Sequence, residues 1–460
     1  MSLRLYRGAS RVLAGLPLRH GRLAESLAGR REAADRWSAW AGEHPAAGPR
    51  IWAHAASVGE ARTLRPVLDR LRRARADDLE IVHTFTSPSV TRWPGLLPAA
   101  RSDYLPLDTP ADVGAVLDGL APDCLVVGRG DLWPELLIQA ARRGIPVAVV
   151  GASMRPGSLR PSLPVRSLYA RALATVSWIG AVTPQDAERW RRTGAPPGVV
   201  EITGDPRHDA VLEQPTELHR IQPMLAWASE AQVLVAGSVE PADEAPLLTA
   251  AKSVLGSVPA ARMLVVPHDA DAAAEQRLLA RAERAGLEAV PWSPGAPPPT
   301  ARCVVVRGSG LLYHLYALGA IAYVGGGFRA GKLHAVIEPA AYGQPIITGP
   351  RITGAADAEA LAAAGALVPA RRHDAAAAIA TAWLRWLREI PSRTAAGLAA
   401  RRSLHEGAAA RSAEALQALL TATRQHCGTC NEAPRASLGA PRACPSPRRS
   451  EVVTSRGSEP

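Results

Sequence analysis

The sequence predicts an α/β fold with two doubly wound, Rossmann-like domains, and three observations lead to this prediction. The chain has 460 residues, more than one ordinary core of roughly 150 to 200 residues accommodates. Short apolar runs alternate with stretches of helical period, a pattern typical of a parallel sheet covered on both faces. The alternation begins at residue 51 and restarts at residue 233, so a second sheet is expected in the second half.

In the first half, the apolar run at residues 51–56 is followed by Leu64, Val67, Leu68 and Leu71, which share one face of a helix. Helical stretches such as residues 131–144 separate some of the later strands. Further strands are predicted at residues 81–85, 124–128, 147–151, 178–182 and 200–204.

In the second half, a helix at residues 381–390 and an alanine-rich helix after Thr394 close the fold. Strands are predicted at residues 233–238, 263–267, 303–308, 321–327 and 345–350. We therefore expect four parts: a basic amphipathic segment able to contact a membrane, two domains joined by a linker near residues 205–230, and a tail without periodicity that we expect to be disordered. Their bounds are residues 1–50, 51–215, 216–425 and 426–460.

The composition limits the function. Hydrophobic residues make up 47% and charged residues 21% of the chain, as in soluble globular proteins. The net charge of +11 calls for an anionic partner: nucleic acid, an anionic membrane surface or a phosphorylated substrate. Aromatic residues are only 4% of the chain, and no zinc-finger spacing, RNP motif or basic heptad array occurs, which argues against nucleic acid.

The cysteines and the N-terminus add little chemistry. The five cysteines are scattered, which favours a reduced cytoplasmic compartment. Cys427 and Cys430 form a CxxC pair without a second pair at zinc-site spacing, so a passive tail is favoured over a metal site. Leucines and arginines interleave over residues 1–30, so no apolar run approaches the ~20 residues that a membrane span needs. A helix lying on a membrane and a plain surface helix both remain open.

Glu60 stands where the first strand gives way to a helix, directly after Gly59. Backbone N–H groups at a helix N-terminus and the helix dipole stabilise an anion, so this carboxylate is expected to be charged at neutral pH. A helix-capping acid and a functional carboxylate both fit this stretch.

Residues 323–350 contain the most informative pattern in the chain. Gly325, Gly326 and Gly327 follow a strand, where missing side chains let a ligand approach the backbone. Lys332 stands in the same loop and is one of only two lysines among 53 basic residues. A phosphate-binding loop is therefore predicted here.

His334 and Glu338 are four residues apart, on one face of a predicted helix. The helix N-terminus and Lys332 are expected to hold a phosphate, while Glu338 accepts hydrogen bonds from ribose hydroxyls. This division of labour suits a nucleotide. A surface pair of His334 with Glu338 is the plainer alternative.

Other polar or small residues also follow predicted strands. Because the carboxyl ends of parallel strands meet at one edge of a sheet, these residues are expected to line a cleft between the domains. They are Ser87, Ser89, Arg129 and Asp131 in the first half, and Gly237, Ser238 and His268 in the second.

Together these motifs resemble the Kdo transferases, which move 3-deoxy-D-manno-octulosonic acid (Kdo) from CMP-Kdo to lipid A during lipopolysaccharide assembly. Single motifs are short, but they keep their order and spacing from about residue 50 to 410. The matching stretches are WAHAASVGE (52–60), TSPS (86–89), YLPLD (104–108), DLWPE (131–135), TGDPRHD (203–209), VAGSVEPADE (235–244), LLYHLYALGAIAYVGGGF (311–328) and HAVIEPAAYGQPIITGP (334–350).

The resemblance implies a GT-B fold and an inverting glycosyltransferase without an obligatory metal or cofactor. Glu60, in the S-x-G-E motif, is implied to be the general base that takes the proton from a lipid A hydroxyl. The first domain is implied to bind the lipid A precursor, with Ser57, Gly59, Ser87, Ser89, Arg129 and Asp131. The second is implied to bind CMP-Kdo, with Gly237, Ser238, His268, Gly326, Gly327, Lys332, His334 and Glu338. The enzyme is then expected to sit peripherally on the anionic cytoplasmic face of the inner membrane.

Several positions depart from the family pattern. Pro267 meets His268 directly, where the family usually has an arginine between them, and Arg129 or Arg329 is a candidate replacement for that cation. Residues 332–335 replace a G-G-H-N motif, residues 129–131 replace E-T-E, and Asp205 replaces an asparagine. Two alternatives therefore stay open: a transferase that uses another nucleotide sugar, and a catalytically silent relative that binds lipid A or the nucleotide sugar.

Overall fold

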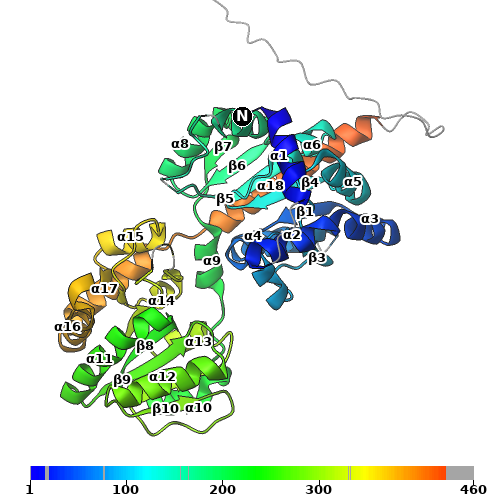
Figure 1. Cartoon of the computed structure of the whole chain (residues 1–460). Coiled ribbons are helices and arrows are strands. Elements are labelled where there is room, and N and C mark those ends of the chain that lie inside the picture. The colour runs from blue at the N-terminus through cyan, green and yellow to red at the C-terminus, as the bar shows by residue number, and fades with distance from the viewer. Residues whose placement is uncertain are drawn as a thin grey trace, which may run out of the picture.

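Two parallel sheets form the body of the protein, as predicted. The computed structural model in Figure 1 describes residues 2–15, 20–75, 78–155, 157–163, 165–329, 331 and 333–430. Each half of the chain contains one seven-stranded sheet with helices around it. In the first sheet Ile51 and Trp52 enter two different cores, one on each face, as alternation along a buried strand requires. The predicted α/β fold with two Rossmann-like domains is confirmed.

The first sheet has the strand order β3-β2-β1-β4-β5-β6-β7. Its strands are β1 (Arg50–His54), β2 (Glu80–Phe85), β3 (Arg101–Tyr104), β4 (Cys124–Gly128), β5 (Val147–Ala152), β6 (Trp178–Ala181) and β7 (Val200–Ile202). The helices are α4 (Val58–Ala74), α5 (Pro110–Leu120), α6 (Pro134–Arg142), α7 (Val165–Leu173) and α8 (Pro184–Thr193). The sequence does not predict β3, because this edge strand is short and mostly polar.

The second sheet has the strand order β10-β11-β9-β8-β12-β13-β14. Its strands are β8 (Gln232–Val239), β9 (Ala261–Pro267), β10 (Ala289–Trp292), β11 (Cys303–Val306), β12 (Ile321–Val324), β13 (Ile346–Thr348) and β14 (Leu367–Pro369). Its helices are α11 (Pro241–Ser257), α12 (Ala272–Arg284), α13 (Leu312–Tyr316), α14 (Ile337–Ala341), α15 (Ala356–Ala363), α16 (Ala375–Arg388) and α17 (Ile390–Arg402). The sequence does not predict the two edge strands, β10 and β14, which are only partly buried, whereas β11, β12 and β13 of similar length are buried throughout.

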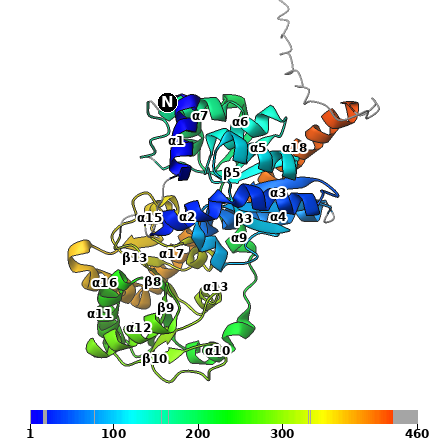
Figure 2. The same cartoon turned by 45° about the vertical axis from the view of Figure 1, so that its right-hand side comes forward.

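The N-terminal segment belongs to the first domain. It forms α1 (Leu3–Gly15), α2 (Arg22–Arg31) and α3 (Ala33–Glu43), which Figure 2 shows in blue against this domain. Trp37 of α3 is fully buried, and its Nε1–H donates to the carbonyl of Tyr104 in β3 (3.0 Å). α1 is held by the phenol of Tyr6, which donates to Asp108 (2.6 Å), and by an ion pair of Arg7 with Glu135 (2.8 Å).

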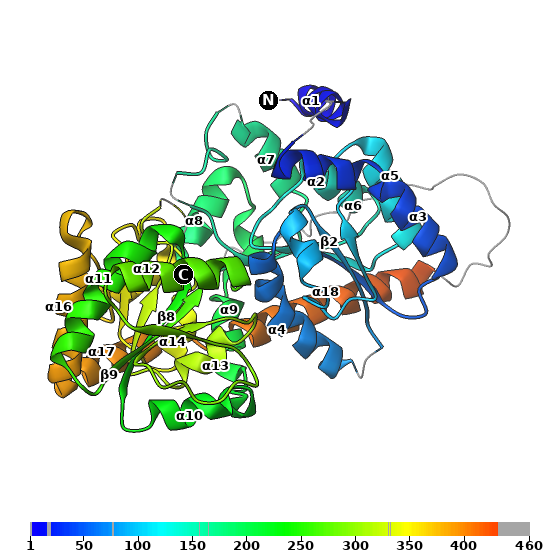
Figure 3. The same cartoon turned by 60° about the horizontal axis from the view of Figure 1, so that its bottom comes forward.

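The C-terminal helix α18 (Ala408–Cys430) returns to the first domain, although the sequence pattern places residues 216–425 in the second. Figure 3 shows it, in orange, beside α4. The apolar stripe of α18 packs on one face of the first sheet; it consists of Ala409, Ala413, Leu416 and Leu420. The helix also runs to Cys430, five residues into the segment expected to be disordered; residues 431–460 lie outside the described part of the chain.

α9 (Pro206–Glu213) lies at the junction of the two domains (Figure 1). The carboxylate of Asp209 accepts the backbone N–H groups of Gly407 (2.6 Å) and Ala409 (2.9 Å), where the chain returns from the second domain. Arg207 donates to Asp357 of α15 (2.7 Å). The TGDPRHD motif therefore ties together the two places where the chain crosses between domains.

Candidate active site

Glu60 lies in the first turn of α4, just beyond the carboxyl end of β1. Its Oε2 accepts the N–H of Ala56 (2.7 Å), so the side chain reaches back over the turn that joins β1 to α4. The carbonyl of Ala56 accepts the N–H of Ser87 (2.9 Å), which follows β2. Glu60 therefore bonds to the turn that precedes the N-cap Ser57, and it stands at the edge where β1 and β2 end.

A buried histidine and a second carboxylate lie beside Glu60. His54, at the end of β1, is fully buried; its Nδ1 lies 3.1 Å from the carbonyl of Thr84, and its Nε2 lies 3.1 Å from Oδ2 of Asp131. Trp133 donates its Nε1–H to the same Asp131 oxygen (3.1 Å). Burial raises the pKa of Asp131, but the hydrogen bonds from His54 and Trp133, together with the electrostatic attraction of His54 and Arg160, outweigh it and leave the pKa below its usual value. Asp131 is thus a fixed negative charge.

These neighbours change the proton affinity of Glu60. Burial raises the pKa of Glu60 above that of an ordinary glutamate, and the charge of Asp131 raises it further. His54, the Ala56 N–H and Arg129 lower it, without cancelling the rise. The sequence predicts an anion stabilised by the helix N-terminus. In the structure the N–H that Glu60 accepts belongs to Ala56, in the turn before the helix, and burial is the larger effect, so the result is a stronger base.

The remaining residues predicted for the first domain gather at the same edge. Ser57 is the N-cap of α4 and Gly59 is exposed in its first turn. Ser87 and Ser89 begin the 3₁₀ helix at Pro88–Arg92, and their hydroxyl oxygens lie 2.8 Å apart. The two serines therefore bond with each other at the end of β2, with their side chains partly exposed.

Arg129 follows β4 in a left-handed backbone conformation, with φ of 56°. This conformation is uncommon outside glycine, and it turns the side chain toward α9. Its Nη2 donates to Ser153 (2.9 Å), and its Nη1 lies 3.5 Å from Asp205. Arg129 is therefore engaged at the domain junction, close enough to Glu60 to lower its pKa.

In the second domain, most of the predicted site glycines are required because a side chain at their position would collide with the protein itself. A Cβ on Gly237 would strike the phenol of Tyr316, one on Gly325 the backbone of Ser238, and one on Gly327 the backbone of Gly349. The expectation that the absent side chains of the loop after β12 make room for a ligand is wrong for Gly325 and Gly327, because the protein's own atoms fill the space. Gly326 adopts a φ of 88°, which requires glycine for conformational reasons.

Ser238 and His268 lie at the ends of β8 and β9, beside the glycine loop after β12. Ser238 has a φ of 51°, a second left-handed residue at a strand end. The His268 and His334 rings stack with their centroids 4.3 Å apart, and Nε2 of His334 lies 3.1 Å from Oε1 of Glu240. Lys332 lies outside the described residues.

Glu338 comes close to the first domain. Its Oε1 lies 3.6 Å from Nη1 of Arg62, two residues after Glu60 on α4, so this ion pair joins the two strand-end regions. Burial raises the pKa of Glu338, and Arg62 lowers it. The prediction that His334 and Glu338 share a helix face is wrong. α14 begins only at Ile337, and the ring of His334, in the preceding loop, is bonded to Glu240.

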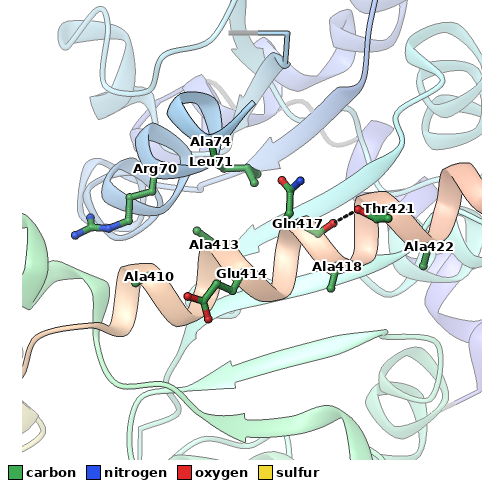
Figure 4. A pocket seen from close by; sticks show the side chains of 10 residues that line it. All are labelled: Arg70, Leu71, Ala74, Ala410, Ala413, Glu414, Gln417, Ala418, Thr421 and Ala422. Atoms are coloured by element: carbon green, nitrogen blue, oxygen red, sulfur yellow. Dashed lines mark hydrogen bonds between the residues drawn. The ribbon is translucent and has the colours of Figure 1, made fainter. Parts of the chain in front are cut away.

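A separate cavity of about 660 Å³ lies between the C-terminal part of α4 and α18 (Figure 4). Alanines form much of its wall, with Arg70, Glu414 and Gln417 as its larger polar side chains. Glu60 is at the opposite end of α4, on the order of 15 Å along the helix from Arg70 at 1.5 Å per residue. None of the residues predicted to bind a substrate lines this cavity.

Sequence reasoning overlooks four residues that shape the site: His54, Arg62, Glu240 and Asp243. His54 and Glu240 stand inside motifs that the sequence brings out, but each looks like an ordinary strand or cap residue until its partner is known. Asp243 is buried and accepts the N–H of Gly326 (2.8 Å) and the phenol of Tyr323 (2.8 Å), so it holds the glycine loop in place. No periodicity in the sequence signals such pairings.

Comparison with known proteins identifies the family. Residues 25–210 match the family described as 3-deoxy-D-manno-octulosonic-acid transferase (kdotransferase). The 3-deoxy-D-manno-octulosonic acid transferase of Bordetella pertussis is 30% identical over 388 residues, which cover 81% of this chain and 88% of that protein. The enzyme of the same name from Chlamydophila psittaci is 27% identical over 331 residues, 70% of this chain and 75% of that protein.

The fold is also found among solved structures. UDP-GlcNAc 2-epimerase from Neisseria meningitidis, bound to UDP-GlcNAc, superposes with a TM-score of 0.58 at 13% identity, covering 81% of this chain and 100% of that one. This likeness supports the two-domain GT-B architecture and carries no information about the substrate. Taken with the relatives above, the order of motifs and the two sheets lead to one conclusion: this chain belongs to the 3-deoxy-D-manno-octulosonic acid (Kdo) transferase family and is a glycosyltransferase.

Proposed function

We propose that the protein transfers Kdo from CMP-Kdo to a lipid A precursor, with inversion, and that Glu60 is the general base. The observation that carries the proposal is the setting of Glu60: a carboxylate with a raised pKa at the carboxyl edge of the first sheet, two residues from an arginine that contacts the second domain. A base so placed can contact an acceptor on the first domain while a donor is held by the second.

The proposed step is a single displacement. An acceptor hydroxyl gives its proton to Glu60 as its oxygen attacks the anomeric carbon of Kdo, and the bond from that carbon to the CMP phosphate breaks, so the electron pair leaves with CMP. The raised pKa of Glu60 favours proton transfer in this step. On the donor side, Glu338 is proposed to accept ribose hydroxyls, and Lys332, the glycine loop and His334 to face the phosphate.

The test is direct transfer. Full-length protein is incubated with freshly generated CMP-Kdo and a bis-phosphorylated tetraacyl lipid A precursor, and products are identified by mass spectrometry. The expected product carries one or more added Kdo units. Transfer from a different nucleotide sugar alone would favour the alternative donor, and nucleotide binding without any transfer would favour a silent relative.

The pH dependence of transfer tests the environment of Glu60. A general base works only when ionised, so kcat/KM is expected to be high above the pKa of Glu60 and to fall as the pH drops through it, above the range of an ordinary glutamate. In Asp131→Asn a negative charge that raises this pKa is removed, so the acid limb is expected to move to lower pH. If transfer stays measurable in that variant and the acid limb does not move, the charge of Asp131 does not raise the pKa of the catalytic base.

We also propose that α1 docks on an anionic membrane surface at the cytoplasmic side. Leu5 and Val12 of α1 are 67% and 66% exposed, and Arg4 and Arg11 are exposed on the same helix. Apolar side chains beside arginines are typical of helices that lie in an anionic interface. No helix in the described part of the chain is both long and apolar enough to cross a membrane.

Vesicle binding tests this docking. Leu5→Ser/Val12→Ser is expected to weaken binding to anionic phospholipid vesicles by about tenfold or more, since apolar burial supplies much of the affinity of such helices. Leu398→Ser, which alters an exposed leucine of α17 in the second domain, is the matched control. Equal vesicle binding by all three proteins would contradict a role for α1.

A further inference from the structure

Two histidines and a glutamate converge at the carboxyl edge of the second sheet. Glu240, His268 and His334 each offer one ligand atom, and these atoms lie within 4.8 Å of one another. The three residues follow different strands, β8, β9 and β12, so the sheet topology brings them together. We propose that they form a binding site for one divalent transition-metal ion, with Zn²⁺ as the best match.

The three ligands are held by backbone contacts that cross between strand ends. The N–H of His268 donates to the carbonyl of Val239 (3.0 Å), and the N–H of His334 donates to the carbonyl of Gly325 (3.2 Å). The N–H of Glu240 donates to Oδ2 of Asp243 (2.9 Å), the buried carboxylate that also holds the glycine loop. The backbone positions of the three ligands are therefore fixed before any ion binds, and only side-chain movements remain, which lowers the cost of binding.

The donor set selects the kind of ion. Two imidazoles and one carboxylate are the ligands of many zinc sites that keep positions open for further ligands, whereas Ca²⁺ and Mg²⁺ prefer oxygen alone. Zinc–nitrogen and zinc–oxygen distances are about 2.0–2.2 Å, which places the ligand atoms of a tetrahedral site about 3.4 Å apart. Ligand atoms that lie up to 4.8 Å apart must therefore approach each other by up to about 1.4 Å when the ion binds. The stacked rings must tilt apart for both nitrogens to face one ion, and the exposed His268 has room to do so.

Metal binding at this site would also affect catalysis if the protein has the proposed function. His334 is proposed to face the donor, and the family resemblance assigns His268 to the same donor site, so an ion that engages both rings withdraws them from it. Zn²⁺ is therefore expected to inhibit transfer in competition with CMP-Kdo. The binding of the ion itself does not depend on the identity of the donor.

The test must separate this site from the CxxC sequence at Cys427 and Cys430, which also offers zinc ligands. All proteins therefore carry Cys427→Ser/Cys430→Ser in the full-length chain. Equilibrium dialysis with Zn²⁺ is expected to give one ion per chain, with about 10- to 100-fold weaker binding in Glu240→Gln and in His268→Ala. His373→Ala, an exposed histidine outside the cluster, is expected to bind normally. Co²⁺ is expected to give visible ligand-field bands without near-ultraviolet thiolate bands.

Two results would overturn the proposed site: no Zn²⁺ binding by the serine-substituted protein, or binding that Glu240→Gln and His268→Ala leave unchanged. A circular dichroism melt of each variant shows whether it is folded, and the exposed His268 makes His268→Ala the safer of the two. Zinc binding without inhibition of transfer would overturn only the competition, and would place the donor away from these histidines. Failure of transfer with zinc binding intact would overturn the proposed function and leave the metal site standing.

Discussion

Glu60→Gln is expected to lower Kdo transfer by about 10²- to 10⁴-fold, the usual contribution of a positioned general base. The amide oxygen of glutamine can still accept the N–H of Ala56, as Oε2 of Glu60 does at 2.7 Å, so the turn between β1 and α4 keeps its hydrogen bond. What the variant loses is the ability to take a proton. Its affinity for CMP, measured by calorimetry, is therefore expected to stay within about twofold, since the base contacts only the acceptor and the transition state.

Glu43→Gln is the matched control for Glu60→Gln. Glu43 ends α3 in the same domain and is exposed, so its substitution is expected to leave transfer unchanged. Two results would contradict the role of Glu60: a variant that keeps near-normal transfer, or one that loses CMP affinity together with activity. The second result would indicate that Glu60 supports the fold of the site instead of the chemistry.

Glu338→Gln is expected to weaken CMP binding by about 10- to 100-fold, the cost of a lost charge-assisted hydrogen bond. Glu338 is partly buried, and in the described structure its nearest charged partner is Arg62, on the other domain. Burial raises the pKa of Glu338, because solvent reaches its carboxylate poorly. Hydrogen bonds from two ribose hydroxyls of the bound nucleotide would replace the missing solvent. Calorimetric titration with CMP measures the effect without requiring the acceptor or the labile sugar.

A second pair of variants separates nucleotide binding from contact between the domains. Arg62→Gln removes the cross-domain ion pair but no proposed nucleotide contact, so CMP affinity is expected to change by less than about threefold, as for other exposed ion pairs. Glu288→Gln, an exposed glutamate of the same domain as Glu338, is the control for charge. Equal losses in Glu338→Gln and Arg62→Gln would mean that Glu338 acts through the domain contact and not through ribose.

Much of the site follows from the strand pattern. Buried parallel strands appear as continuous apolar runs, and the residues after them must lie along one edge of the sheet. For this reason the sequence alone places Ser57, Glu60, Ser87 and Asp131 near one another. The sequence does not predict the edge strands β3, β10 and β14, which are short and only partly buried, although it does predict the fourth edge strand, β7.

The wrong predictions have a common cause. Four-residue spacing suits one helical turn and so predicts His334 and Glu338 on one helix, but the backbone of His334 is tied to Gly325 and α14 starts three residues later. The glycines after β12 suggest an opening for a ligand, whereas the backbones of Ser238 and Gly349 occupy the space beside Gly325 and Gly327. In each case the contact that determines the local structure comes from a residue outside the helical repeat. Periodicity predicts contacts only between residues that are close in sequence.

The sequence by itself determined the two-sheet architecture, the family and the position of Glu60. The architecture depends on local apolar runs, and the family and Glu60 depend on short motifs and on their order along the chain. Tertiary structure alone decided the rest. It packed α18 on the first domain and placed the buried His54 and the partly exposed Asp131 beside Glu60. It also joined Arg62 to Glu338 and gathered Glu240, His268 and His334. The proton affinity of a carboxylate depends on burial and on charges a few ångströms away, and only the folded chain brings those charges together.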